Sequence, residues 1–219
     1  MHWADFAAQT LSQRGNKHII ASGITPSGEF HIGHLREILT GDMITRACRS
    51  AGLDAEFVFI VDSADPLRKV YPFLSDEYEQ YIGCALATIP APDENGKPGN
   101  DGRNYAEHFL EPFLAALAQI DVRPRIIDNY DSYANGKFAE KSRIACEKAG
   151  EIREIIERVS GRELAEKWFP YNPYGHDGSL DGVTVTGFEW PYVYWEQNGV
   201  PGKSDLNKAD GKLPWRIDW

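Results

Sequence analysis

The fold class of this 219-residue chain is decided by the stretch Lys17–Val61, KHIIASGITPSGEFHIGHLREILTGDMITRACRSAGLDAEFVFIV. A short β run at Lys17–Ser22 leads into a turn rich in proline and glycine. From Phe30 to Ser50 apolar residues recur at helical spacing, and Gly52 supplies the expected stop before a second β run at Ala55–Val61. Strand, turn, long helix and strand predict a βαβ unit, whose parallel strands must lie in a sheet covered by helices.

The segments on either side extend this α/β pattern. A helix is expected before the first strand, and two helices with a third strand between them are expected after the second. Beyond Trp168, glycine and proline punctuate two short β runs, which predicts a small β-rich insertion. The expected helices are His2–Arg14, Tyr105–Ile120 and Phe138–Val159, the third strand is Arg125–Asp128, and the late β runs are Val183–Thr186 and Tyr192–Trp195.

The charge balance is acidic, with 23 Lys and Arg against 33 Asp and Glu and a formal net charge of −10. Capture of nucleic acid by charge alone needs clustered Lys and Arg near the phosphates, so this balance opposes it. A local basic groove can still coexist with an acidic surface, and an RNA partner therefore stays open.

Cysteine usage and the amino terminus bear on location. The three cysteines, Cys48, Cys84 and Cys146, are far apart and form no Cys-x-x-Cys pair, which favours a reducing compartment and disfavours a cysteine-ligated metal. No basic leader followed by an apolar run opens the sequence, and no stretch approaches the roughly 20 apolar residues of a membrane span. We expect a cytoplasmic protein with no membrane partner.

The sharpest feature for function is the segment Thr25–His34, TPSGEFHIGH, between the first strand and the long helix. A phosphate chain placed there would meet backbone N–H groups and the positive end of the helix dipole. His31 and His34 are three residues apart, so they share a helix face and can both donate to phosphate oxygens. Gly33 has no side chain, so a flat adenine ring could lie against the backbone. A histidine pair alone is usually structural; the strand–turn–helix context favours a nucleotide site here.

These residues resemble the His-Ile-Gly-His signature of class I aminoacyl-tRNA synthetases, and the surrounding sequence resembles the class I lysyl-tRNA synthetases in particular. The resemblance extends from His2 to the last residue in several separated blocks. Those blocks are Ser22–Gly28, Leu35–Glu37, Tyr105–Phe109 and Lys212–Trp219, together with Asp62, Asp65, Arg68, Lys69 and Val70 in the Asp-rich loop after the second strand.

The resemblance implies the first half of a Rossmann-type parallel sheet at residues 1–135, followed by a helical and β-rich connective insertion at 136–219. It implies ATP-dependent activation of lysine and transfer to tRNA, with Mg²⁺ bridging the phosphates. It assigns His31 and His34 as catalytic residues, and Pro26, Gly28, His31, Gly33 and His34 as ATP-binding residues. It assigns Gly23, Thr25, Asp62, Asp218 and Trp219 to the amino-acid pocket, although Trp219 could equally be a core aromatic.

Two departures from the family pattern leave alternatives open. The second signature, a Lys-Met-Ser-Lys-Ser type loop, and the helical anticodon-binding region are both missing from these 219 residues. The family often carries cysteine pairs in its insertion, whereas Tyr174–Ser179 has none, so we expect no zinc. The chain alone is therefore expected to be an incomplete ligase. The alternatives are a stand-alone paralogue acting on an acceptor other than tRNA and a non-catalytic ATP-binding fragment; the natural terminus and oligomeric state also stay open.

Overall fold

A computed structural model describes residues 2–214 and residue 217. The contacts divide the chain into two compact units. Unit 1 comprises residues 1–63 and 86–129, and unit 2 comprises residues 64–85 and 130–219. In this division the segment 64–85 groups with residues 130–219, whereas the boundary expected from the sequence, after residue 135, concerns the family's catalytic domain and its insertion.

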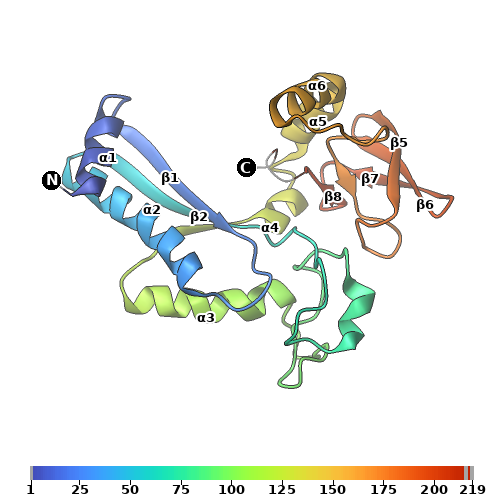
Figure 1. The fold of residues 1–219 in the computed structure, drawn as a ribbon, viewed down its shortest axis with the longest axis horizontal. Helices are drawn as coiled ribbons and strands as arrows, with labels where there is room; N and C mark the ends of the chain where they lie inside the picture. Colours follow the sequence, from blue (N-terminus) through green and yellow to red (C-terminus); the bar gives the residue numbers. More distant parts are fainter. Residues whose placement is uncertain (1, 215–216, 218–219) are drawn as a thin grey trace. The chain divides into compact units, whose positions relative to one another are not determined.

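Unit 1 contains a three-stranded parallel sheet, as the βαβ pattern predicted (Figure 1). The strands β1 (Lys17–Ile24), β2 (Asp54–Val61) and β3 (Arg125–Asp128) lie in the order β1-β2-β3. Ile24 pairs with Val61, and Val61 pairs with Asp128, so the three strands end at one common edge. In an open α/β sheet this carboxyl edge is where ligands collect.

Three helices accompany this sheet: α1 (Trp3–Ser12), α2 (Ile32–Ser50) and α3 (Tyr105–Gln119). α2 runs alongside β1 and β2 (Figure 1), and its Ile38 is fully buried against Phe57 and Phe59. A Cβ added at Gly41 of α2 would lie 2.4 Å from the Phe57 ring, so glycine permits this close helix–sheet contact. The first half of the Rossmann-type sheet is thus present, with the long helix starting at its carboxyl edge.

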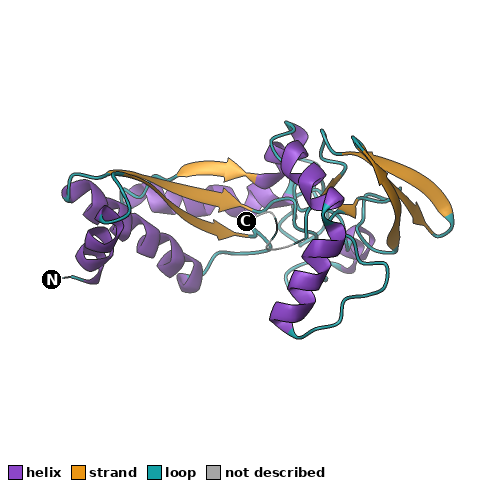
Figure 2. Ribbon diagram, turned by 90° about the horizontal axis from the view of Figure 1, so that it is seen from above, coloured by secondary structure: helices purple, strands orange, loops and turns teal. Residues whose placement is uncertain are grey.

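Unit 2 combines short helices with antiparallel strands (Figure 2). Its core contains Tyr171, Val193 and Leu213, all less than 2% exposed. The single helix expected over Phe138–Val159 is two helices that meet at Lys148. The elements are η1 (Asp76–Tyr81), α4 (Asn129–Ala134, starting at the last residue of unit 1), α5 (Ala139–Glu147), α6 (Ala149–Ser160), β4 (Asn172–Pro173), β5 (Val183–Glu189), β6 (Tyr192–Gln197), β7 (Val200–Asp205) and β8 (Gly211–Lys212).

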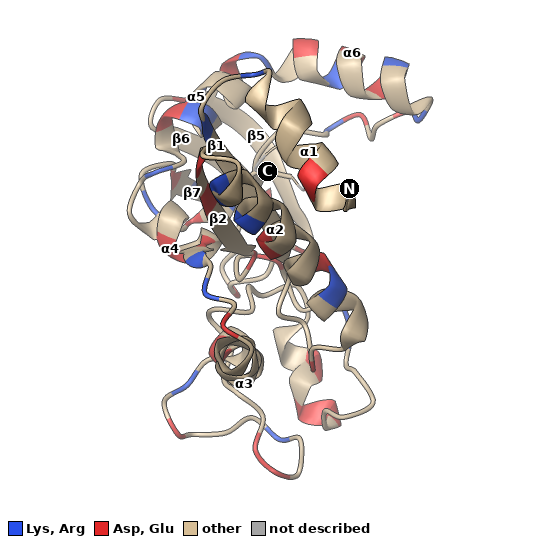
Figure 3. Cartoon of the chain, turned by 90° about the vertical axis from the view of Figure 1, so that its left-hand side faces the viewer, with Lys and Arg blue, Asp and Glu red and all other residues tan. Residues whose placement is uncertain are grey.

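Charged residues are spread over both units, and α6 carries both acidic and basic residues along its length (Figure 3). That helix has no buried residue, so its charges lie on a solvated face. Among the residues that the structure describes, no helix is long and apolar enough to cross a membrane.

Candidate functional site

The turn Thr25–His31 joins the end of β1 to the start of α2 and is held at both ends. The backbone N–H of Asp62 donates to the Ile24 carbonyl at 3.0 Å, which extends the β1–β2 ladder to the edge. Inside the turn, the Ser27 N–H donates to the Thr25 carbonyl at 2.8 Å. The hydroxyl of Tyr105, at the start of α3, donates to the Ser27 carbonyl at 2.9 Å. Pro26, a residue of this turn, is buried.

Aromatic packing fixes the turn to the helix layer. The Phe30 ring stacks on Phe113 of α3, with ring centroids 4.2 Å apart and planes 9° apart. The same Phe30 ring meets His34 edge-on at 5.2 Å. Aromatic pairs in such arrangements stabilise beyond the area they bury, so the position of His34 is set by packing as well as by the helix.

His31 and His34 cap the helix with their own Nδ1 atoms. The Gly33 backbone N–H donates to His31 Nδ1 at 3.0 Å, and the His31 backbone N–H donates to His34 Nδ1 at 3.0 Å. The two rings stack with centroids 3.9 Å apart. An Nδ1 that accepts a hydrogen bond carries no proton, so the neutral ring carries its proton on Nε2. Each histidine therefore holds an Nε2–H donor ready for a ligand.

The neutral form of His34 is favoured electrostatically. Burial, and then the neighbouring His31, lower the pKa of His34 from its ordinary value of about 6.5. Protonation of Nδ1 would replace an acceptor by a donor facing the His31 N–H. Because the folded pKa is the lower one, the unfolded chain takes up the proton first as the pH falls. The stability from this group is present above about pH 6.5 and is lost below it.

The backbone N–H groups at the start of α2 are mostly satisfied by the turn itself. The Gly33 N–H goes to His31 Nδ1, and the His34 N–H donates to the His31 carbonyl at 2.9 Å. Among the described residues, only the Ile32 N–H of the first three helical positions has no recorded partner. This corrects the expectation of several free backbone donors: an anion here would depend on the two Nε2–H groups and the helix dipole.

Gly33 is required by the His31 ring. A Cβ on Gly33 would lie 2.8 Å from His31 Cε1 and 2.9 Å from His31 Nδ1, closer than carbon contacts allow. From the sequence, the missing side chain of this glycine was expected to let an adenine ring lie against the backbone. The structure adds an internal reason, since the imidazole lies over the Gly33 backbone to accept its N–H.

Gly33→Ala is expected to leave overall stability nearly unchanged and to weaken anion binding. Alanine in place of a helical glycine stabilises by about 0.5–1 kcal/mol, whereas displacing a capping side chain costs about 1 kcal/mol. The two effects nearly cancel, but the His31 ring must swing away. Urea unfolding together with ATP titration measures both; a variant that binds ATP as tightly as the wild type would contradict this reading.

The residues assigned to an amino-acid pocket lie at the same edge, as far as the structure describes them. Gly23 pairs with Ile60 near the end of β1, and Thr25 follows that strand. The Asp62 side chain is buried, and the amide of Asn129 donates to it at 3.5 Å. Asp218 and Trp219 lie outside the described residues.

Polar residues after β2 and β3 were missed by the sequence reasoning. The Ser63 hydroxyl donates to the Asp128 carboxylate at 2.6 Å, and Asn129 lies beside Asp62. These residues lie at or just beyond the carboxyl ends of neighbouring parallel strands, which is the signal that could have found them. Ser22 of β1 adds a long contact to the Glu37 carboxylate, at 3.4 Å.

Asp65 of the Asp-rich loop has a structural partner within unit 2. Lys212 donates to its carboxylate at 2.6 Å. The Lys212 side chain is 3% exposed and the Asp65 side chain is 6% exposed. Arg68 approaches the other carboxylate oxygen at 3.5 Å. Asp65 therefore ties the loop after β2 to the strand β8.

No group of three or more His, Cys, Asp or Glu side chains suited to a metal ion occurs among residues 2–214 and 217. Cys84 and Cys146 of unit 2 are buried free thiols, and burial raises the pKa of Cys146 to about 12.

Comparison with known proteins shows that this chain is similar in sequence to one group of enzymes, the class I lysine–tRNA ligases. The family described as tRNA synthetases class I (K) matches residues 1–219. The lysine–tRNA ligases of Archaeoglobus fulgidus, Methanosarcina barkeri strain Fusaro and Methanocaldococcus jannaschii are 42%, 40% and 37% identical to this chain, each over all of it. The aligned regions are 43%, 40% and 41% of those relatives, so the chain spans about two fifths of their length.

Proposed function

Because this chain belongs to the class I lysyl-tRNA synthetase family, we propose that its turn Thr25–His34 binds the triphosphate of ATP for the activation of lysine. The observation that carries the proposal is the pair of imidazoles whose Nδ1 atoms are used by backbone N–H groups. This arrangement leaves two Nε2–H donors at the start of a 19-residue helix. An anion is favoured there by both hydrogen bonding and the helix dipole.

The reaction is an in-line displacement at the α-phosphorus. A lysine carboxylate oxygen forms a bond to that phosphorus, the bond to the bridging oxygen of the β-phosphate breaks, and pyrophosphate leaves with the electron pair. Negative charge gathers on the phosphate oxygens as this happens. Donors that are already oriented stabilise that charge without reorganising, which is the role of His31 and His34.

The carboxyl edge of the sheet would hold the amino acid. Gly23 would contribute its backbone and Thr25 its hydroxyl beside the phosphate turn. Asp62 would contribute a negatively charged carboxylate to pair with the ammonium group of lysine. Asp218 and Trp219 complete the proposed pocket by the family resemblance. Transfer of lysine to tRNA belongs to the same proposal, with the remaining three fifths of the relatives' length contributing parts that this chain does not span.

Mg²⁺ would bind together with ATP and not at a separate site made of protein side chains. Because the described residues present no cluster of metal ligands, the ion would be held mainly by phosphate oxygens of ATP. Its contribution would be to neutralise phosphate charge while the two imidazoles orient the chain of phosphates.

Exchange of pyrophosphate into ATP in the presence of each of the twenty amino acids tests the proposed function. The protein at its natural length is expected to catalyse exchange with lysine and with no other amino acid at comparable rate. Exchange without charging of any tRNA would favour the paralogue that serves another acceptor. ATP binding without exchange would favour a non-catalytic protein. Exchange that depends on a different amino acid would refute lysine as the substrate.

A further inference from the structure

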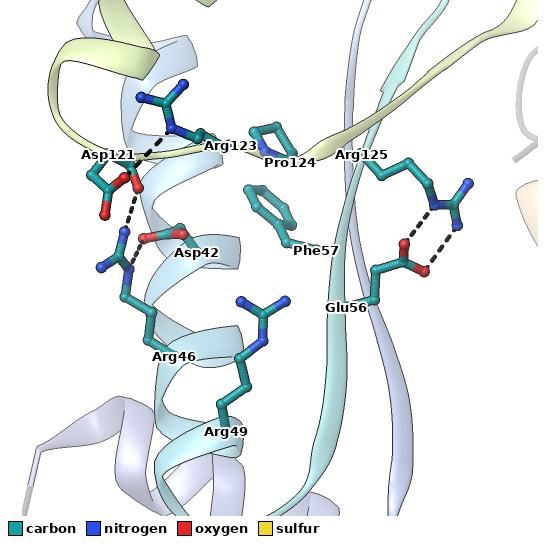
Figure 4. Close-up of a pocket in the computed structure, with 9 residues that line it drawn as sticks. All are labelled: Asp42, Arg46, Arg49, Glu56, Phe57, Asp121, Arg123, Pro124 and Arg125. Atoms are coloured by element: carbon teal, nitrogen blue, oxygen red, sulfur yellow. Dashed lines mark hydrogen bonds and ion pairs between the residues drawn. The ribbon is translucent and has the colours of Figure 1, made fainter.

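A cavity of about 470 Å³ opens in unit 1 at the amino ends of β2 and β3 (Figure 4). Glu56 is near the start of β2 and Arg125 is the first residue of β3, so the cavity is at the edge opposite the Thr25–His34 turn. Eight strand residues at about 3.3 Å each separate the two edges by roughly 25 Å. The lining residues are Asp42, Arg46, Arg49, Glu56, Phe57, Asp121, Arg123, Pro124 and Arg125.

The lining reverses the charge balance of the whole chain. The chain carries a formal charge of −10, whereas four arginines face three carboxylates around the cavity. Arg46 and Arg49 lie on α2, whereas Arg123 lies just before β3 and Arg125 is its first residue, so the two pairs are far apart in the sequence. A local excess of guanidinium groups on an acidic protein is where an anion would be attracted.

Three of the four guanidinium groups, those of Arg46, Arg49 and Arg125, are held by an Nε hydrogen bond, and all four keep terminal N–H groups for a ligand. Arg49 Nε donates to the Ala55 carbonyl at 2.8 Å, and Arg46 Nε donates to Asp42 at 2.6 Å. Arg125 holds Glu56 through Nε and one terminal nitrogen, at 2.6 and 3.0 Å. Within the described part of the chain, both terminal nitrogens of Arg49 lack a hydrogen-bond partner. In each of the other three cavity arginines, one terminal nitrogen lacks a partner among the described residues.

The existing ion pairs are open to competition. Arg125 and Glu56 are 50% and 45% exposed, and Arg123 and Asp121, 3.5 Å apart, are 68% and 80% exposed. Pairs this exposed contribute little, because water screens them. A multiply charged anion could therefore bind the free edges of the guanidinium groups without first breaking a strong interaction. A guanidinium group that is already held by a hydrogen bond loses less conformational entropy on binding than a mobile side chain does.

We propose that this arginine-lined cavity binds the phosphate groups of a ligand, separately from the Thr25–His34 turn. Guanidinium groups match phosphate oxygens in pairs, and the cavity is large enough for two or three linked phosphates. Phe57 and Pro124 add an apolar surface beside the charges, as Figure 4 shows. The phosphates belong either to a free oligophosphate or to an RNA backbone.

The test uses the double variant His31→Ala, His34→Ala as its background, which removes the donors of the nucleotide turn. Inorganic triphosphate is titrated by calorimetry, and an unmodified tRNA transcript by fluorescence anisotropy at two salt concentrations. Arg49→Gln in this background is expected to weaken binding about tenfold, because two charged donors are lost. Glu56→Gln is expected to tighten binding, because a competing carboxylate is removed from Arg125.

Arg158→Gln on α6 is the matched control, since it removes the same charge from an exposed side chain of unit 2. If Arg49→Gln fails to fold, Arg123→Gln serves in its place, because that side chain is 68% exposed. Loss of triphosphate binding identifies the free anion as the source of the phosphates, and loss of only tRNA binding identifies RNA. The proposal is overturned if neither probe saturates the double-histidine background, or if the cavity variants change affinity no more than Arg158→Gln does.

Discussion

Replacing His31 and His34 together by alanine is expected to weaken ATP binding by more than about 100-fold while the circular-dichroism spectrum stays the same. Each imidazole offers one Nε2–H donor to a charged phosphate oxygen, and a hydrogen bond to a charged group contributes about 1.5–3 kcal/mol. Two such bonds amount to at least about 3 kcal/mol, which is more than a hundredfold in affinity. Calorimetric titration of the purified chain with ATP measures the change.

Two variants separate this role from helix capping. His2 caps α1 in the same way, with its Nδ1 accepting the Ala4 N–H at 3.3 Å, so His2→Ala removes a histidine cap remote from the turn in sequence. It is expected to cost about 1 kcal/mol of stability and leave ATP affinity unchanged. His31→Asn keeps a good capping side chain but moves the donor, so stability should hold while affinity falls. Equal ATP affinity in the wild type and the double alanine variant would remove the basis for the site.

Replacing Lys212 by methionine is expected to destabilise unit 2 by about 3–5 kcal/mol, because the Asp65 carboxylate would stay buried without its main partner. Arg68 reaches the same carboxylate only at 3.5 Å and is 66% exposed, so it compensates in small part. Five of the six tryptophans lie in residues 130–219, and only Trp3 lies in unit 1. Urea unfolding followed by tryptophan fluorescence therefore reports mainly on unit 2.

The double variant Asp65→Leu, Lys212→Met is the control for this pair. Removing both charges at once leaves no buried carboxylate unpaired, and such replacements are often neutral or stabilising. The double variant should therefore recover most of the stability lost by Lys212→Met alone. If the double variant were less stable than the single one, packing of the lysine stem and not its charge would be the cause.

Local sequence patterns predicted the elements of unit 1 well, because its strands and helices follow one another as a βαβ unit. The expected strand Arg125–Asp128 agrees with the structure in both bounds, and α2 begins two residues after the expected start at Phe30. β7 was missed, since Val200–Asp205 contains proline, glycine and three polar residues and is an edge strand paired only with β6. Its conformation depends on that partner and not on its own propensity.

Contacts between distant residues could not be predicted in this way. The ion pair Asp65–Lys212 joins residues 147 positions apart, and the Tyr174 hydroxyl donates to the Ala64 carbonyl at 2.8 Å across 110 positions. These contacts place the segment 64–85 in unit 2. No periodicity or spacing in the sequence carries such information.

The sequence pattern located the candidate site at the start of the long helix but could not give its hydrogen bonds. The spacing predicted that His31 and His34 share one face at the helix start, and in the structure their rings lie side by side with centroids 3.9 Å apart. Which nitrogen of each ring accepts a backbone N–H depends on side-chain rotamers, which the sequence pattern does not determine. For this reason the helix start has fewer free backbone donors than its sequence indicated, since Nδ1 of His31 already accepts the Gly33 N–H.

The most direct test of the proposed ATP site observes the imidazole nitrogens of His31 and His34 by ¹H–¹⁵N NMR, with and without saturating ATP. The sequence has six histidines, so the His31→Asn variant and a His34→Asn variant assign the two sets of signals. Because both Nδ1 atoms accept backbone N–H groups, both rings are expected to carry a proton on Nε2, and ATP should shift their Nε2–H signals while leaving those of His2 unchanged. A proton found on Nδ1 of both rings, or Nε2 signals that do not move when ATP is bound, would contradict the account.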